Sequence, residues 1–231
     1  MTTELPASVP RITALRDDIG MSEDTSTRSG PGRPAGTDSG DTRQRVLDAA
    51  CRCFAQYGYG PATNSLIAEM AGVTAGSLHY HFGTKSSLFD AVCDYVYGKI
   101  IARSVEVLAG PHSVRGLLRA VLAESMRINH ESPELAGFVA TAPIDARRHP
   151  ELSAPFAKQA QAMSSTVARA VTAGQRAGRI PADLDTETVV GMVIAIVDGF
   201  AHAAAQTDVA AMDSMNELFG SLLLDEPDRA P

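Results

Sequence analysis

The sequence lacks tryptophan and has few other aromatic residues, since phenylalanine and tyrosine together make up 5% of its 231 residues. Apolar residues nevertheless make up 45% of the chain, and Ala, Leu and Val are abundant among them. Ala and Leu lose little side-chain freedom in a helix, whereas aromatic and β-branched residues lose more. The composition therefore favours an all-α fold. The length suffices for one large domain or two modest ones.

Cysteine is also scarce, and the N-terminal segment has no apolar core of a secretory signal. We therefore expect a cytoplasmic protein whose thiols stay reduced. Cys51 and Cys53 could suggest a metal site or a disulfide, but side chains two residues apart on a helix point to different faces. Buried structural thiols are the favoured interpretation for these two and for Cys93. We expect no metal and no cofactor.

The net charge of −7 argues at first against DNA as a partner. By region the acidity is uneven: residues 41–90 hold four basic and four acidic residues, whereas residues 91–231 hold twelve basic and seventeen acidic ones. A balanced N-terminal region permits DNA binding without demonstrating it. Residues 1–40 are rich in Pro, Ser, Thr, Gly and Asp and are predicted to be a disordered arm. Arg28 and Arg33 in that arm are candidates to reach DNA.

Capping residues and apolar periodicity predict four helices in the next segment. They begin at Asp41–Thr42 and after Thr63, Thr74 and Thr84, because Thr and Asp are good N-caps. Glycines end the first three, and Gly72 suits the left-handed position that closes a helix. Two short helices joined by a glycine turn are the helix-turn-helix layout, whose second helix enters the major groove of DNA.

The order of residues in this segment makes the helix-turn-helix interpretation more specific. The segments RVLDAA (45–50), FAQYG (54–58), IAEMAGVT (67–74) and SLHYHFGTKSSL (77–88) closely resemble the DNA-binding domain of the TetR family of transcriptional regulators. The resemblance covers residues 41–90. It implies an N-terminal three-helix helix-turn-helix domain and a divergent C-terminal helical domain for ligand binding and dimerisation. We therefore expect an arm at 1–40, a DNA-binding domain at 41–94 with its helix-turn-helix at 64–83, and a ligand-binding and dimerisation domain at 95–226.

The resemblance also implies the DNA-contacting residues, with Lys85 as a phosphate-binding lysine. The predicted set is Thr63, Asn64, Ser65, Thr74, Ala75, Gly76, Ser77, His79, Tyr80, His81 and Lys85. One position departs from the pattern, since the family usually has Tyr where this chain has His79. Helical geometry selects Tyr80 as a base-reading residue together with Ser77, whereas the family pattern selects His79. We expect Ser77 and Tyr80 to read bases and His79 to contact phosphate, and local packing of His79 and His81 is the alternative.

The C-terminal region offers a candidate effector pocket. The helix predicted at 113–131 carries an apolar stripe that turns polar at Ser125 and Asn129, as a pocket wall for a ligand with a polar group would. Exposure of these two residues to solvent is an equally good interpretation. Phe138, Phe156 and Met163 complete the predicted pocket, although Phe and Met at helical spacing are more often core residues. Residues 143–150 are predicted to be a turn, followed by a long helix from Glu151 to about Gly178.

The helix predicted after Asp185 is apolar nearly all round and must be covered on both sides. Together with the amphipathic last helix it predicts a four-helix homodimer interface, in which Gly191, Ala195 and Gly199 allow close approach. A role in the protein's own core is the alternative. The predicted interface residues are Val193, Ile196, Val197, Phe200, Met215, Phe219 and Leu222.

The same helix is interrupted by Asp198 and His202, which are expected to pair on one face. These polar residues and its short length argue against a membrane span. We therefore expect no membrane partner.

Three classes of function remain to be compared. The favoured one is a DNA-binding regulator, most often a repressor, that binds a palindromic operator as a homodimer and is released by a small-molecule effector. An enzyme is disfavoured, because the chain has no G-x-S-x-G, P-loop, HExxH or dinucleotide-binding motif, and we expect no catalytic residues. A helical interaction module that never binds DNA is the third class, and its behaviour would be insensitive to salt.

Overall fold

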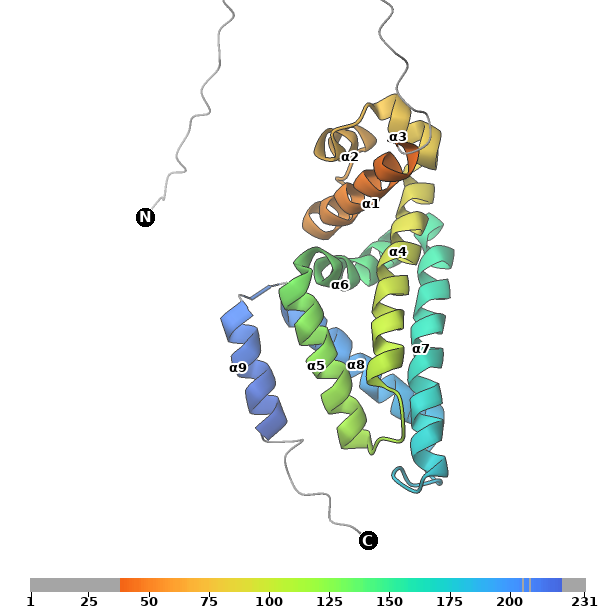
Figure 1. Ribbon diagram of the computed structural model, residues 1–231, viewed down its shortest axis with the longest axis vertical. Coiled ribbons are helices and arrows are strands. Elements are labelled where there is room, and N and C mark those ends of the chain that lie inside the picture. The colour runs from red at the N-terminus through yellow and green to blue at the C-terminus, as the bar shows by residue number, and fades with distance from the viewer. Residues whose placement is uncertain (1–37, 205, 208, 222–231) are drawn as a thin grey trace, which may run out of the picture. The chain divides into compact units, whose positions relative to one another are not determined.

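The computed structural model describes residues 38–204, 206–207 and 209–221, and every regular element within them is helical (Figure 1). The predicted all-α fold is therefore confirmed. The predicted arm at residues 1–37, with Arg28 and Arg33, lies outside the described residues, as does Leu222.

The first four helices are α1 (Asp38–Tyr57), α2 (Asn64–Ala71), α3 (Ala75–Phe82) and α4 (Lys85–Val107). The three predicted threonine caps are confirmed, because each hydroxyl accepts the backbone N–H three residues on at 3.1 Å. Gly72 closes α2 in the left-handed conformation, with φ 63° and ψ 39°. Helix α1 begins at Asp38 rather than at Asp41–Thr42, which places Asp41 in the first turn, where a carboxylate interacts favourably with the helix dipole.

The remaining helices are α5 (Val114–Glu131), α6 (Pro133–Arg148), the 3₁₀ turn η1 (Pro150–Leu152), α7 (Ser153–Arg176), α8 (Thr186–Ala204) and α9 (Val209–Phe219). The predicted turn from residue 143 to residue 150 is wrong, since α6 continues through Pro143 to Arg148. Proline removes one backbone hydrogen bond from a helix. Burial of Asp145 and Ala146 on the following turn offsets that loss.

Two apolar clusters form the core. The first joins α1–α4 to α6 through three phenylalanines, with the Phe89 ring centroid 5.3 Å from those of both Phe54 and Phe138. Phe138 therefore lies in this core, and its predicted place in the effector pocket is wrong because its ring packs between α1 and α4. The second cluster lies among α5, α7 and α8. The three cysteines are buried free thiols, as predicted, and burial raises the pKa of the Cys51 thiol to about 12.

Helix α8 alone among the described helices is long and apolar enough, by length and composition, to cross a membrane. The expectation that it is too short is therefore wrong. Its Val189, Val190 and Val193 are buried against the second cluster. The predicted pairing of Asp198 with His202 is also wrong, because the His202 ring hydrogen-bonds Gln206 at 2.6 Å.

Gly174 on α7 is a point of close approach. A Cβ atom there would lie 2.4 Å from the His112 carbonyl oxygen and 2.8 Å from Ile180 Cδ1. We predict that Gly174→Ala lowers the free energy of unfolding by roughly 1–3 kcal/mol, because backbone cannot move away cheaply. Gly98→Ala on α4 is the matched control, since nothing lies within 4 Å of its Cβ position, and it should stabilise by roughly 0.5–1 kcal/mol. Urea unfolding of both variants measures the difference, and equal stabilities would contradict the prediction.

Candidate functional site

Helix α3 presents one face to the core and the other to solvent. Leu78 and Phe82 are buried, whereas 84% of Tyr80 is exposed. Figure 1 shows α2 and α3 next to each other at one end of the described chain. All eleven predicted DNA residues lie on these two helices, their caps or the first residue of α4, and none of them is buried. The helix-turn-helix thus keeps its predicted contact residues accessible.

His79 and Tyr80 differ in how they are held. The His79 Nδ1 atom lies 2.9 Å from the Gly83 carbonyl oxygen. A carbonyl only accepts, so Nδ1 carries the proton, and Nε2 can donate to a phosphate only when the ring is protonated. The Tyr80 ring packs edge-on against its neighbour His81, with centroids 5.3 Å apart, and is otherwise largely exposed. Its phenol remains available to a base edge.

Backbone carbonyl groups bind the ammonium group of Lys85. Its Nζ atom donates to the carbonyl oxygens of Tyr59 at 2.8 Å, Gly60 at 3.3 Å and Ala62 at 2.9 Å. The same ammonium lies 4.1 Å from the centroid of the Tyr59 ring. These carbonyls belong to the loop between α1 and α2, so Lys85 ties the start of α4 to the segment that leads into the helix-turn-helix.

The same loop is bound from α6. The backbone N–H of Tyr59 donates to Asp145 Oδ2 at 2.8 Å, and Asp145 is buried. The ring of His149, just beyond α6, packs edge-on against Tyr59 with centroids 4.9 Å apart. Sequence reasoning missed Asp145, because a lone Asp inside a predicted turn carries no signal of a contact 86 residues away.

Arg43 is a second residue that the sequence did not single out. It is exposed on α1, and its guanidinium carbon lies 5.2 Å from the ring centroid of Phe82. Phe82 is the last residue of α3, which is the recognition helix of the helix-turn-helix. Its neighbour Arg45 instead forms an ion pair with Asp41 at 3.4 Å and reaches the Ala71 carbonyl at 3.4 Å. Arg43 is therefore placed to add positive charge beside α3.

A cavity of about 160 Å³ lies among α4 to α8. Its wall includes four of the five predicted pocket residues, namely Ser125, Asn129, Phe156 and Met163. Helix α6 contributes Ala136, Val139 and Pro143 to the same wall. Among the described residues that line it, most are apolar, and they include Glu124 and Asp198 but no Lys, Arg or His.

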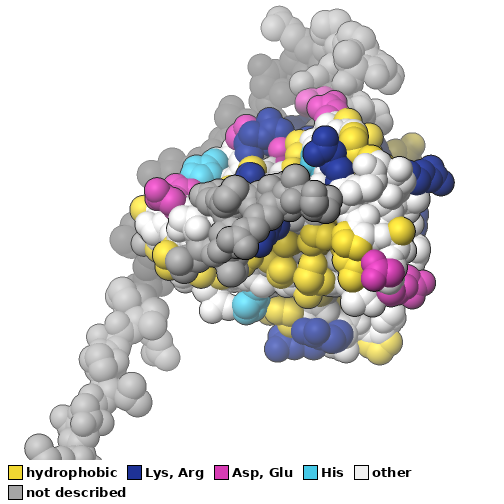
Figure 2. All heavy atoms as spheres, turned by 90° about the horizontal axis from the view of Figure 1, so that it is seen from below, with side chains coloured by type: hydrophobic (Ala, Val, Ile, Leu, Met, Phe, Trp, Pro, Cys, Tyr) yellow, Lys and Arg dark blue, Asp and Glu magenta, His cyan; other side chains and the backbone are white. Residues whose placement is uncertain are grey.

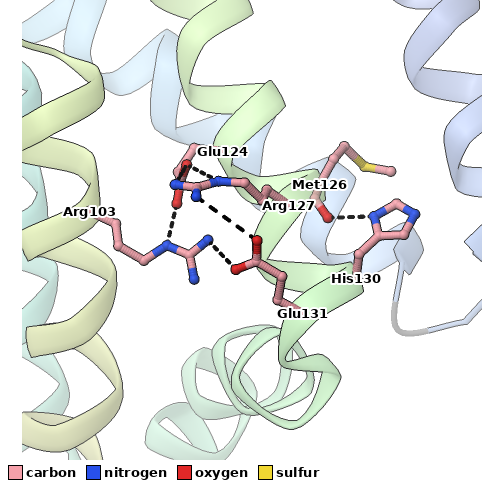
Figure 3. Close-up of polar contacts among 6 residues, drawn as sticks. All are labelled: Arg103, Glu124, Met126, Arg127, His130 and Glu131. Carbon is pink, nitrogen blue, oxygen red and sulfur yellow. Dashed lines mark hydrogen bonds and ion pairs between the residues drawn. The ribbon is translucent and has the colours of Figure 1, made fainter.

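Glu124, one of the lining residues, is bound by two arginines (Figure 3). It is only 5% exposed, and its two carboxylate oxygens accept from Arg103 of α4 at 2.5 Å and from Arg127 at 2.6 Å. Arg103 also binds Glu131 at 2.8 Å. A buried carboxylate needs such partners, because an unpaired charge is costly to bury. The cluster joins α4 to α5 at the cavity.

The predicted dimer residues differ in how far they are buried within their own chain. Val193 is fully buried within its own chain, so its assignment to the interface is wrong, because it packs inward against α5 and α7. Ile196, Val197 and Phe200 are partly buried, and Phe200 meets Phe219 edge-on with centroids 5.2 Å apart. The exposed apolar side chains include Met192, Met215 and Leu218. Figure 2 shows apolar side chains gathered between charged groups on one face of the molecule.

An ionisable pair, His130 and Asp213, joins α5 to α9. His130 Nε2 lies 3.3 Å from Asp213 Oδ2, and Nδ1 lies 2.8 Å from the Met126 carbonyl. The hydrogen bond to Met126 and the nearby Asp213 carboxylate raise the pKa of His130. The charged form of His130 is therefore favoured in the folded chain, and this ion pair weakens as the pH rises through the raised pKa.

These features define a class of protein: a helix-turn-helix DNA-binding protein with a helical, cavity-containing C-terminal region. Residues 46–92 match the sequence model of bacterial regulatory proteins of the tetR family, and residues 114–225 match that of the BetI-type transcriptional repressor C-terminal domain. The chain belongs to the TetR family of transcriptional regulators. The resemblance inferred from residues 41–90 is therefore confirmed, as is the function of transcriptional regulator.

Characterised relatives are similar over most of their length. The chain is 23% identical to the HTH-type transcriptional regulator UidR of Escherichia coli K12, over 75% of this chain and 87% of UidR. It is 28% identical to the HTH-type transcriptional repressor AcnR of Corynebacterium glutamicum, over 72% of this chain and 83% of AcnR.

The fold is also that of solved TetR-type structures. The regulator FadR from Bacillus subtilis, in complex with stearoyl-CoA, is 23% identical, with a TM-score of 0.64 over 76% of this chain and 96% of FadR. A regulator from Saccharomonospora viridis in complex with choline is 19% identical, with a TM-score of 0.63 over 80% of this chain and 98% of that one.

We predict different effects for Tyr80→Ala and His79→Ala. Removing a base-reading side chain should cost roughly 1–3 kcal/mol on the operator alone and relax the preference at one base position. Removing a phosphate-contacting side chain should weaken operator and random DNA about equally. We expect the first pattern for Tyr80 and the second for His79, measured by competition with single-base operator variants. A changed base preference in His79→Ala with none in Tyr80→Ala would reverse the assignment.

Proposed function

We propose that the protein is a repressor that binds a palindromic operator as a homodimer and leaves it when a small molecule occupies the cavity. One observation carries the proposal: α6 lines the cavity through Pro143 and, two residues later, holds the α1–α2 loop through Asp145. A single helix thus touches both the candidate effector site and the segment that leads into the helix-turn-helix. On this proposal residues 41–94 bind DNA, and residues 95–226 sense the effector and dimerise.

The coupling would work through the position of α6. An effector that pushes on Val139 and Pro143 shifts the carboxylate of Asp145, and the N–H of Tyr59 follows it. The α1–α2 loop then moves α2 and α3 away from the spacing that fits DNA. Such coupling is worth typically 1–3 kcal/mol, or roughly 5–150-fold in affinity, and operator DNA must weaken effector binding by the same factor.

The lining of the cavity also restricts the chemical class of the effector. Within the wall Glu124 is neutralised by Arg103 and Arg127, so Asp198 is the carboxylate that disfavours an anion, and the apolar lining favours a compact, largely apolar molecule. We therefore propose an uncharged or positively charged effector. Choline, bound by the Saccharomonospora regulator, is of this kind, whereas stearoyl-CoA, bound by FadR, is an anion.

Double-stranded DNA, a second copy of the chain and this effector are the partners that we propose. The proposal places the protein in the cytoplasm and assigns it neither a membrane partner nor a catalytic activity. The regulatory relatives and the polar residues Asp198 and His202 within α8 support this assignment.

In the decisive experiment, the purified protein is used to select genomic DNA fragments, and the selected fragments are footprinted. We expect protection of two half-sites related by two-fold symmetry, about one helical turn or more apart, because the operator mirrors a dimer's symmetry. Small amines, alcohols and fatty acids are then tested for release. Ala160 lines the cavity from α7, whereas Ala157 on the same helix is exposed.

Ala160→Phe should therefore abolish release by an active amine or alcohol without abolishing operator binding. Ala157→Phe, which adds the same ring outside the cavity, should leave release intact. If the Ala160→Phe variant left the operator at the same compound concentration as the wild type, this would contradict a role for the cavity. A failure to select any fragment would contradict the repressor itself.

Dimerisation is proposed through the outer face of α8. Gly191, Ala195 and Gly199 recur there every four residues and are exposed, and nothing lies within 4 Å of a Cβ placed at either glycine. The large apolar side chain of Met192 stands beside them, 41% exposed. Small residues in a row let two helices pack closely, and a second copy of α8 would cover this apolar face.

We predict that Gly199→Leu converts the dimer to a monomer without unfolding the chain, since the added side chain meets nothing in its own subunit. Gly98→Leu is the control, because Gly98 is also exposed and unobstructed but lies on α4. Sedimentation at micromolar concentration should report a dimer for the wild type and Gly98→Leu. A monomeric wild type, or a dimeric Gly199→Leu, would contradict this interface.

A further inference from the structure

We propose that small molecules enter and leave the cavity through a surface groove beside α1, past the side chain of Asn129. This route rests on the proposed effector cavity and adds the residue that controls access to it. The groove, of about 590 Å³, lies where α1, α5, α6 and the end of α8 meet. It is open to solvent at the exposed side chains of Arg52 and Gln56, and Glu134 of α6 lines it as well.

The groove and the cavity are separated by a partition of three side chains. Asn129 of α5, Ala136 of α6 and Ala204, the last residue of α8, line both hollows. The partition is therefore one side chain thick. Two of its members are alanines, whose side chains are single methyl groups. Only Asn129 has a side chain that can open the partition by changing its rotamer.

No hydrogen bond holds the Asn129 amide within the described part of the chain, although the residue is half-buried. The next residue on α5 is different, because the ring of His130 is bound by the Met126 carbonyl and the Asp213 carboxylate. Rotating an amide that no protein group binds breaks no hydrogen bond within the chain, so the rotation costs little. Asn129 is thus the movable member of the partition.

The cavity also approaches solvent at Asp198. Among the described residues that line the cavity, this one is exposed and the others are buried or half-buried. Asp198 follows Gly191 and Ala195 by seven and three residues, so it shares their face of α8. A second subunit bound to that face covers Asp198. The groove is bordered by α1 and α6, which carry none of the proposed interface residues, so it remains the way in.

Stopped-flow fluorescence of indole tests the route. Indole is compact, apolar and uncharged, and the chain has no tryptophan whose emission would obscure it. A side chain that obstructs entry slows association and dissociation by the same factor and leaves Kd unchanged. We expect Asn129→Ala to accelerate both rates roughly tenfold with little change in Kd, because association is slow where a conformational change is required.

Ser125→Ala is the matched control. Ser125 lies one turn earlier on α5 and is also a half-buried polar residue, but it lines the cavity and not the groove. A residue that only contacts the bound molecule acts mainly on dissociation. Ser125→Ala should therefore change the dissociation rate, and with it Kd, while the association rate stays constant.

A reversible thiol label tests the open end of the groove. Gln56→Cys places a thiol there without touching the cavity wall, and a methanethiosulfonate reagent attaches a bulky group to it. The three native cysteines are fully buried and should stay unlabelled, since burial raises the pKa of each thiol and the thiolate is the reactive form. We expect the label to slow both indole rates in Gln56→Cys, and a reducing agent to restore them. Labelled Ala157→Cys, exposed on α7 outside the groove, should keep the wild-type rates.

An unchanged association rate in either Asn129→Ala or labelled Gln56→Cys would overturn the proposal and favour entry beside Asp198. A change in dissociation alone in Asn129→Ala would overturn it too, because Asn129 would then contact the bound molecule without controlling its passage. Absence of saturable indole binding to the wild type would instead contradict the effector cavity itself, and this route with it.

Discussion

The hydrogen bond from the Tyr59 backbone to the buried Asp145 carboxylate is the constraint on which the rest of the structure depends. A buried carboxylate is stable only where its oxygens are satisfied. Here the loop between α1 and α2 supplies the N–H donor. The hydrogen bond therefore fixes α6 relative to the segment that leads into the helix-turn-helix. Around this bond α1 and α6 pack closely: a Cβ at Gly137 would lie 3.1 Å from that of Ala55.

The tight junction between α1 and α6 contrasts with the space left further along the chain. Phe54, Phe89 and Phe138 fill the junction with contacting rings. On the far side of α6, a cavity of about 160 Å³ remains among α4, α5, α7 and α8. Packed elements transmit displacement, whereas a void absorbs it or accepts a ligand. Helix α6 is therefore packed rigidly against α1 and α4 on one side, whereas on the other side it faces a cavity that can deform.

Much of this arrangement could be predicted from local sequence. Thr63, Thr74 and Gly72 mark helix ends through hydrogen bonds and backbone angles that involve only neighbouring residues. The polar end of the α5 stripe likewise placed Ser125 and Asn129 at the cavity wall, because helical spacing alone decides which face they share.

What could not be predicted depends on partners distant in sequence. Phe138 and Val193 carry the same apolar signal whether they face a pocket, an interface or the core, and only the packing of other helices decides. Pro143 signals a break, but burial of the next turn kept the helix intact. The bonds of Lys85 to a loop 23 to 26 residues earlier have no counterpart in local spacing.

The distribution of positive charge explains how an acidic chain can bind DNA. Of the four basic residues between 41 and 90, Lys85 is held by carbonyls and Arg45 is paired with Asp41. Arg52 is exposed on the part of α1 that follows, and Arg43 lies against the end of the recognition helix. Arg43 therefore keeps an exposed guanidinium beside α3, where a phosphate contact would add to the salt-sensitive part of the affinity. On the proposed function, uncharged groups on α3, above all the exposed Tyr80, supply the base recognition that phosphate contacts alone cannot give.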